Sequence, residues 1–145
     1  MTFVKAEVPA DEQHVAMELG LLFDEIRRVL VSEEWDGLRP SHLRVMGYVP
    51  PNGISITELA VHVGMTKQGC GQFVSQLVDT GHLVVEPDPD DGRVRLVRRT
   101  PAGDSATRAL ALRMAQVERG WAARVGERRY RTFRRVLEEI AAGDS

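Results

Sequence analysis

The chain has 145 residues, of which 28% are charged and 43% hydrophobic, and these proportions exclude a wholly disordered protein. No apolar run approaches the roughly 20 residues of a membrane helix, and the first residues do not resemble a secretory signal. A single cysteine excludes an internal disulfide. We therefore expect a cytoplasmic protein with one hydrophobic core and no membrane partner.

The formal net charge of −2 says little about function, but its distribution says more. Residues 1–64 hold five Lys or Arg and ten Asp or Glu, whereas residues 65–145 hold fourteen and eleven. The first part of the chain is therefore acidic, and positive charge collects later. A nucleic-acid-binding protein with a near-neutral total has to gather its positive charge on one face.

Two helices are predicted after a loose terminus of about ten residues. From Asp11 onward, apolar residues recur every three or four positions and predict a long amphipathic helix; they are Val15, Leu19, Leu22, Ile26 and Val29. Pro40 suits the first position of a second helix, which ends at the turn sequence 50–53.

Two further helices follow with a tight turn between them. Ser55 and Glu58 have the spacing of a capping box, and Gly64 suits the left-handed end of that helix. Thr66 is a favourable N-cap for the next helix, which ends at Gly81. Two helices joined by a short turn that contains glycine are the signature of a helix-turn-helix.

A β-hairpin and two long helices complete the chain. Residues 83–85 and 94–98 are predicted strands on either side of the turn-rich segment 87–92, and together they form a wing. Thr100 and Pro101 suit the start of a fifth helix, and a sixth follows. The two helices have apolar faces at Leu110, Met114, Val117 and Trp121, and at Tyr130, Phe133, Leu137 and Ile140. The predicted fold class is α+β, mostly helical: a winged helix-turn-helix with long flanking helices.

The second helix of the helix-turn-helix gives the strongest indication of function. One face is apolar and points to the core: Cys70, Phe73, Val74 and Leu77. The opposite face is polar and lacks a carboxylate: Lys67, Gln68, Gln72 and Ser75. Gln can bond to adenine and Lys to guanine or phosphate, while the first amides and Thr66 can hold a phosphate. An ordinary solvated face is the alternative, but the position within the motif favours DNA binding.

Gly69 and Gly71 are unusual within this helix, because each costs about 1 kcal/mol relative to alanine. They either let the helix approach DNA closely or reflect a packing requirement or a tolerated weakness.

The predicted wing tip, residues 91–93, gives a second indication of DNA binding. Arg93 would project into a minor groove, and Asp91 could orient it through an ion pair. Phosphate-binding capacity would come from the second strand, with Arg95, Arg98 and Arg99. Because the wing also contains Asp88 and Asp90, a plain polar hairpin is the alternative.

Residues 41–103 resemble the MarR family of bacterial regulators. The matching segments are 56–60, 64–68, residue 72, 77–81, 88–93 and 100–103, and the last two are the most specific. The resemblance implies a homodimer with dimerisation helices at residues 11–35 and 101–142 and a DNA-binding domain at residues 38–100. Two departures are Arg39, where the family usually has a small cap residue, and the weakly helical run 69–71.

The resemblance also implies pseudo-palindromic operator DNA and repression that a small ligand or oxidation often relieves. The predicted DNA-binding residues are Thr66, Lys67, Gln68, Gln72 and Ser75 for the helix and Asp91, Arg93 and Arg95 for the wing. A pocket for a small aromatic or lipophilic effector would involve Met17, Trp35, His42, Met46 and Tyr48, although core packing explains these residues equally well.

Other chemistry receives little support. Cys70 lies on the inward face and is expected to be an inert thiol rather than a redox sensor, and the four histidines lack metal-ligand spacing. We expect no metal, no cofactor and no enzymatic activity, because no catalytic motif is present. The remaining alternative is a winged-helix protein-interaction module without DNA binding, which the two glycines and the acidic wing suggest. Salt-dependent binding to DNA would separate the two.

Overall fold

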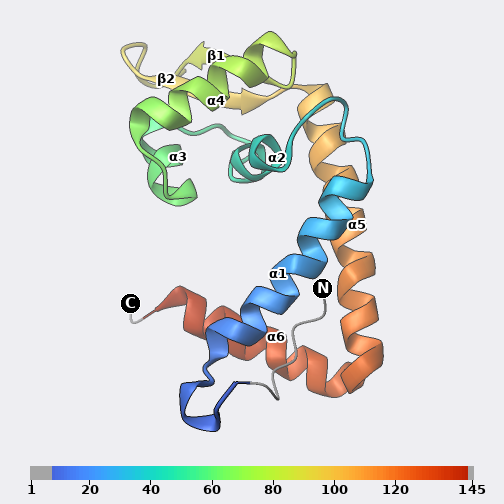
Figure 1. Cartoon of the computed structure of the whole chain (residues 1–145). Coiled ribbons are helices and arrows are strands. Elements are labelled where there is room, and N and C mark those ends of the chain that lie inside the picture. Colours follow the sequence, from blue (N-terminus) through green and yellow to red (C-terminus); the bar gives the residue numbers. More distant parts are fainter. Residues whose placement is uncertain (1–7, 144–145) are drawn as a thin grey trace. The chain divides into compact units, whose positions relative to one another are not determined.

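The computed structural model describes residues 8–143, which fall into two compact units, residues 8–110 and 111–143 (Figure 1). The first unit holds four helices, a two-stranded sheet and the first turns of a fifth helix. The second unit holds the rest of that helix and a sixth. Within residues 8–143, no helix has both the length and the apolar character to cross a membrane. The predicted fold class is confirmed.

The first long helix starts later than expected. A 3-10 turn covers Ala10–Glu12, and α1 runs over Val15–Ser32. The prediction of a helix from Asp11 was wrong by four residues, because Gln13 and His14 have extended backbone angles that separate the turn from the helix. The apolar period that indicated this helix begins at Val15, and the acidic residues before it carried no such period.

Three helices form the centre of the first unit: α2 (Pro40–Gly47), α3 (Ile56–Val63) and α4 (Lys67–Asp79). The predicted hydroxyl N-caps of α3 and α4 are present. The Ser55 hydroxyl accepts a hydrogen bond from the Glu58 amide at 3.2 Å, and the Thr66 hydroxyl accepts one from the Gly69 amide at 3.0 Å. Gly64 ends α3 at φ 75°, a left-handed conformation that glycine adopts at little cost.

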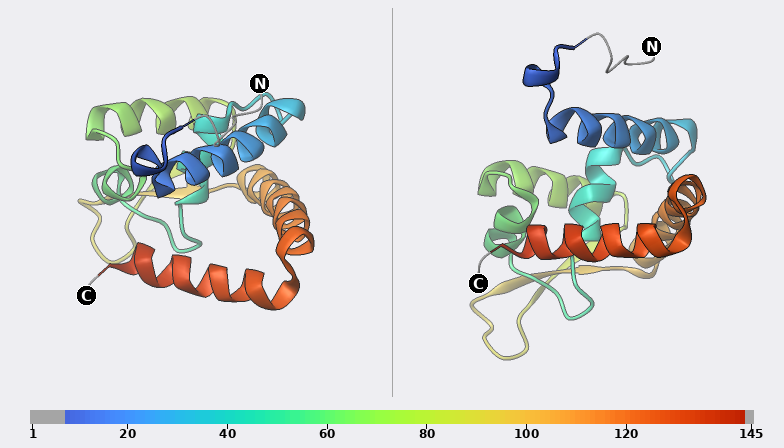
Figure 2. Two further views of the ribbon diagram at one scale, coloured as in Figure 1. Left: turned by 60° about the horizontal axis from the view of Figure 1, so that its bottom comes forward. Right: turned by 90° about the horizontal axis from the view of Figure 1, so that it is seen from below.

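The wing consists of β1 (Leu83–Pro87) and β2 (Arg95–Arg99), which pair antiparallel with Leu83 opposite Arg99. Ile54, before α3, extends this sheet: it exchanges two backbone hydrogen bonds with Val97, at 3.1 and 2.7 Å. The loop between β1 and β2 projects from the helices of the first unit (Figure 2). The strands and the helix-turn-helix are therefore joined through Val97.

A single hydrophobic core holds the helix-turn-helix to the wing. Its largest fully buried side chains come from α2, α3, α4 and β1, and they include Leu43, Met46, Leu59, Leu77 and Leu83. Burying each such side chain contributes about 1.5–3 kcal/mol. This core fixes the orientation of α4, whose outer face is the candidate site.

Two helices, the later part of α5 (Pro101–Val125) and α6 (Glu127–Ala142), make up the second unit. They are joined at Gly126, which has φ 94°. The Tyr130 hydroxyl donates a hydrogen bond to Glu118 at 2.7 Å, and Arg134 pairs with Glu118 and Glu138. The predicted apolar face of α6 is largely exposed: Phe133, Leu137 and Ile140 are 38%, 39% and 72% exposed.

Candidate nucleic-acid interface

The two faces of α4 are segregated as the sequence predicts. Cys70, Val74 and Leu77 are buried, and Phe73 packs against the core from its edge. The exposed side chains on the other face are Lys67, Gln68, Gln72 and Ser75. This face offers one positive charge and several amide and hydroxyl groups, and it lacks a carboxylate from Thr66 to Val78. Such a surface can bond to base edges and does not repel phosphate.

The start of α4 presents backbone donors. Thr66 has extended backbone angles, and its hydroxyl is used to cap Gly69. The first helical backbone hydrogen bond runs from the Cys70 amide to the Thr66 carbonyl, at 2.9 Å. The amides of Lys67 and Gln68 precede that bond, so they point out of the helix end with the positive end of its dipole. This is the geometry that holds a phosphate.

His42 is a buried histidine that contacts two residues of α4, a role that the sequence does not reveal. The His42 ring is 8% exposed and accepts a hydrogen bond at Nδ1 from the Arg39 amide, at 3.1 Å. Because Nδ1 accepts, Nε2 carries the ring proton and donates to the side-chain oxygen of Gln76 at 2.8 Å. The ring also meets Phe73 edge-on, with centroids 5.5 Å apart. His42 thereby connects the N-terminus of α2 to Gln76, an exposed residue of α4.

The turn before α4 is held by Arg44, which the sequence analysis did not single out. Its guanidinium donates a hydrogen bond from α2 to the carbonyl of Val63, at 2.6 Å. Val63 is the last residue of α3, and its carbonyl has no partner within the helix. A basic residue in a helix that precedes a helix-turn-helix is a weak signal, so this contact could not be predicted.

The wing tip has the geometry that the sequence predicts. The Asp91 carboxylate accepts two hydrogen bonds from Arg93, one from the backbone amide at 3.1 Å and one from Nε at 3.2 Å. The Arg93 side chain is nevertheless 92% exposed. The hydrogen bonds from Arg93 lower the pKa of Asp91 below its ordinary value. The pair therefore presents an oriented, solvent-facing guanidinium.

Two of the acidic wing residues shape the turn by accepting hydrogen bonds from backbone amides. The Asp88 carboxylate accepts a hydrogen bond from the Asp90 amide at 2.9 Å, which is an Asx turn. Asp91 binds Arg93 in the same manner. The acidic character of the wing is therefore partly structural.

The three arginines of β2 have different environments. Arg95 is exposed, as a phosphate-binding residue should be. Arg98 lies 3.5 Å from a carboxylate oxygen of Glu86, and Arg99 lies 3.3 Å from one of Asp104. Arg98 and Arg99 therefore lie near carboxylates of the fold, and the phosphate-binding role of all three arginines stays a prediction.

The two glycines of α4 differ. A Cβ at Gly69 would lie 3.0 Å from the capping hydroxyl of Thr66, so the N-cap restricts this position. A Cβ at Gly71 would meet no neighbour within 4 Å. Packing inside the described part of the chain therefore accounts for Gly69 but not for Gly71, which lies on the outer side of the helix.

The five residues predicted to line an effector pocket lie in different surroundings. Trp35 and Met46 belong to the core cluster, and the Trp35 indole donates a hydrogen bond to the Leu30 carbonyl at 2.7 Å. His42 is engaged with α4, and Tyr48 is exposed. Met17 lines a shallow hollow together with other residues of α1 only: Ala16, Gly20, Leu21, Phe23, Asp24 and Arg27. The effector site stays a prediction.

Cys70 lies with no exposed surface on the inner face of α4. Burial raises the pKa of its thiol. A thiol that is neutral and shielded reacts slowly with oxidants.

Comparison with known proteins finds similarity over the same elements. The sequence profile of the MarR family matches residues 36–94, which contain α2, α3, α4 and most of the wing. The transcriptional activatory protein BadR of Rhodopseudomonas palustris is 30% identical over 82 residues. This alignment covers 54% of the chain, and it spans about half of BadR, 47%.

Solved structures share the fold over most of the chain. CouR from Rhodococcus jostii RHA1, bound to p-coumaroyl-CoA, is 20% identical with a TM-score of 0.71 and covers 90% of this chain and 91% of its own. The PcaV regulator from Streptomyces coelicolor, in complex with its natural ligand, is 24% identical with a TM-score of 0.64 and 99% coverage of both chains. A structure of MarR is 17% identical with a TM-score of 0.77, and the coverages are 97% and 94%.

At these identities the solved structures establish the fold, while the profile match places the family's sequence features on the helix-turn-helix and wing. Over residues 36–94 the chain is similar to the MarR family, and over most of its length it shares the winged helix-turn-helix fold of MarR.

Proposed function

We propose that this protein is a transcriptional regulator that binds a pseudo-palindromic DNA operator as a homodimer. The observation that carries the proposal is the outer face of α4, where Lys67, Gln68, Gln72 and Ser75 are exposed beside a capped helix N-terminus. We assign this face to the major groove, where Gln and Lys can read base edges and the first amides can hold a phosphate.

The wing supports the same proposal from a second position. Arg93 is held by Asp91 and exposed, and Arg95 is exposed on the same hairpin. We assign Arg93 to the minor groove and Arg95 to a phosphate of the flanking DNA backbone. In this assignment Asp91 does not touch DNA but orients Arg93.

The homodimer is proposed because both flanking helices leave apolar side chains exposed. Ile140 on α6 and Phe23 on α1 are 72% and 61% exposed, and exposed apolar surface of this kind usually marks an association surface. Sedimentation velocity tests this point: Ile140→Glu is expected to yield monomers. Ala142→Glu, on the opposite side of α6, is the matched control and should leave the dimer intact.

Repression is the simpler regulatory outcome, because a bound dimer only has to occupy the promoter. Activation would require a further surface that contacts the transcription machinery. BadR is named as an activator, so activation is the competing outcome. A reporter gene distinguishes repression from activation when its promoter carries an operator selected from a random DNA pool. Repression predicts higher expression of the reporter when this protein is absent.

A small aromatic or lipophilic effector forms the last part of the proposal. CouR is described with p-coumaroyl-CoA bound and PcaV with a natural ligand, and a related fold can offer a comparable site here. A thermal-shift screen of aromatic acids and their thioesters tests it: binding to the folded protein raises the melting temperature and, for an effector, releases DNA.

The DNA-binding proposal is tested by selecting bound sequences from a random DNA pool. We expect an enriched inverted repeat whose half-sites are about one helical turn apart. The second candidate function, a winged-helix module that binds a protein instead, predicts no enrichment and no DNA binding even at low salt. It rests on Gly69 and Gly71, which weaken α4 as a recognition helix.

A further inference from the structure

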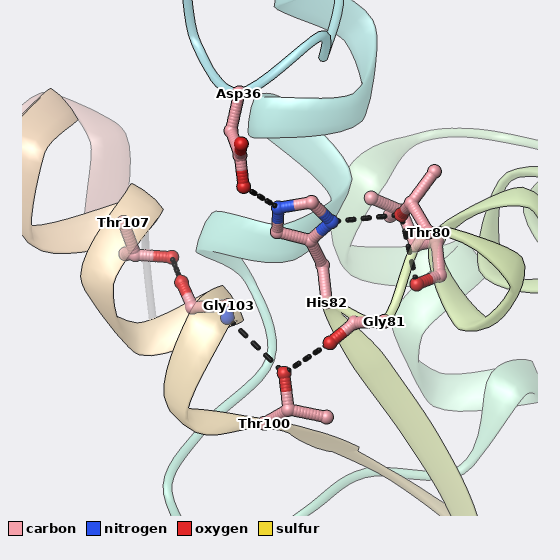
Figure 3. Close-up of polar contacts among 8 residues, drawn as sticks. Asp36, Thr80, Gly81, His82, Thr100, Gly103 and Thr107 are labelled. Carbon is pink, nitrogen blue, oxygen red and sulfur yellow. Dashed lines mark hydrogen bonds and ion pairs between the residues drawn. The ribbon is translucent and has the colours of Figure 1, made fainter.

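His82 is a buried polar residue where several segments of the first unit meet. Its side chain is 3% exposed, and it lies between the end of α4 and the start of β1 (Figure 3). Its Nε2 lies 2.8 Å from a carboxylate oxygen of Asp36, and its Nδ1 lies 2.7 Å from the Thr80 hydroxyl. Because a carboxylate oxygen can only accept, Nε2 carries a proton and donates a hydrogen bond to Asp36.

The backbone of His82 forms a hydrogen bond at the start of α5. Its carbonyl accepts a hydrogen bond from the Thr100 amide at 3.1 Å, and the Thr100 hydroxyl donates one to the Gly81 carbonyl at 2.5 Å. The same hydroxyl caps the helix by accepting from the Gly103 amide at 3.2 Å. A Cβ at Gly103 would overlap the His82 carbonyl oxygen, so only glycine allows α5 to pack this closely.

Asp36 lies in the loop that connects α1 to α2, so His82 joins two separate connections. The His82 side chain bonds Asp36 in the loop that follows α1. The His82 carbonyl accepts a hydrogen bond from the amide of Thr100, the residue before α5. Asp36 has φ 56°, a left-handed conformation that is uncommon for a residue other than glycine. Asp and Asn tolerate this conformation better than most residues do, and the hydrogen bond to His82 stabilises it at Asp36.

We propose that the Asp36–His82 pair is a positioning element that sets the angle at which α1 and α5 leave the winged domain. This inference rests on the proposed function, because in a dimer held by the flanking helices that angle sets the distance between the two recognition helices. Loosening the pair leaves the DNA-contacting side chains of α4 and the wing in place. It widens the range of half-site spacings that the dimer accepts.

The test uses Asp36→Gly, which removes the carboxylate and keeps the positive φ without strain. Asp36→Asn is the conservative variant, because it keeps an oxygen acceptor and tolerates the same backbone. Glu34→Gly is the matched control: it removes an exposed carboxylate from the same loop and makes none of the His82 contacts. Since the Asp36 side chain is 72% exposed, these variants are expected to fold.

The first measurement is the affinity for the selected operator and for operators with the half-site spacing changed by one base pair. In Asp36→Gly, the preference for the selected spacing should fall by roughly threefold or more. Asp36→Asn should recover most of it, and Glu34→Gly should match the wild type. A loss of folded protein lowers the affinity for all spacings by one common factor. If Asp36→Gly lowers all affinities by one common factor, or changes none of them, the preference for the selected spacing is unchanged and the proposal is overturned.

The second measurement does not need DNA. Amide hydrogen exchange at Thr100, whose N–H is bonded to His82, should become faster in Asp36→Gly, while α3 and the middle of α4 exchange as in the wild type. Unchanged exchange at Thr100 would contradict the positioning role. If the wild type binds no DNA, the proposed function fails, and the exchange result still decides whether Asp36 holds this junction.

Discussion

The carboxylate of Asp91 holds Arg93 at two points, the backbone amide and the side-chain Nε. The two bonds close a small ring at the wing tip and leave the Arg93 side chain 92% exposed. An arginine that is already oriented loses less conformational entropy when it enters a groove than one that is free. The wing is therefore preorganised for an anionic partner.

Arg93→Ala is expected to lower affinity for the selected operator by about tenfold or more, because it removes the minor-groove contact. The dimer should be unaffected, because Arg93 is exposed at the wing tip. Fluorescence anisotropy with a labelled operator measures the affinity, and sedimentation velocity checks the dimer. Equal affinities for the variant and the wild type would remove Arg93 from the proposed interface.

Asp91→Ala should weaken binding less than Arg93→Ala, since it frees the guanidinium without removing it. The pKa of Asp91 is lowered by Arg93, so the pair is present above the ordinary carboxylate pKa and is lost only as the pH falls through the lowered value. The difference in affinity between wild type and Asp91→Ala should thus stay constant between about pH 5 and pH 8. A difference that disappears within this range would show that Asp91 does not act as an ionised partner.

Lys67 and Gln72 should differ in what they contribute. Lys67→Ala is expected to reduce the slope of log affinity against log salt by about one, because a phosphate contact is lost. Gln72→Ala should leave this slope unchanged and alter the base preference at one position of each half-site. Binding to an operator series at several salt concentrations separates the two, and identical behaviour of the two variants would refute the assignment of α4 to the major groove.

Gly71→Ala should stabilise the protein by about 1 kcal/mol, because alanine favours helix and its Cβ would meet no neighbour. If Gly71 allows close approach to DNA, the same change should weaken operator binding. Gly20→Ala in α1, another open helix position, is the control that should gain stability alone. Thermal melts and operator titrations give both quantities, and unchanged DNA binding would mean that Gly71 is only a tolerated weakness of α4.

Cys70 should react slowly with a thiol reagent such as DTNB in the folded protein and rapidly after unfolding in guanidinium. Its side chain is fully buried, and burial raises the pKa of the thiol, so little thiolate is available near neutral pH. A fast reaction in the native state would show instead that Cys70 is accessible and suited to redox sensing.

Much of the fold could be predicted because its signals are local. The caps at Ser55, Thr66 and Thr100 are set by residues three positions away, and the two faces of α4 follow from helical periodicity. Asp91 and Arg93 are only two positions apart, so their pairing could also be predicted from the sequence. The effector residues and the site assignments remain predictions.

The contacts that hold the site in place could not be predicted, because they join residues far apart in the chain. His42 and Gln76 are separated by 34 positions, and His82 and Asp36 by 46. A histidine within an apolar pattern gives no sign of which distant side chain it will meet. Strand register decides similarly that Arg98 lies near Glu86, which charge counting along the chain cannot reveal.

Sequence-specific recognition of DNA through α4 and the wing is the main function that we propose for this protein. The most direct measurement is the ratio of its affinities for the selected inverted repeat and for a scrambled duplex of equal length and composition, at about 150 mM salt. We expect a ratio of about a thousandfold or more, which Arg93→Ala and Gln72→Ala both reduce. A ratio near one, or no binding to either duplex, would contradict the proposed function.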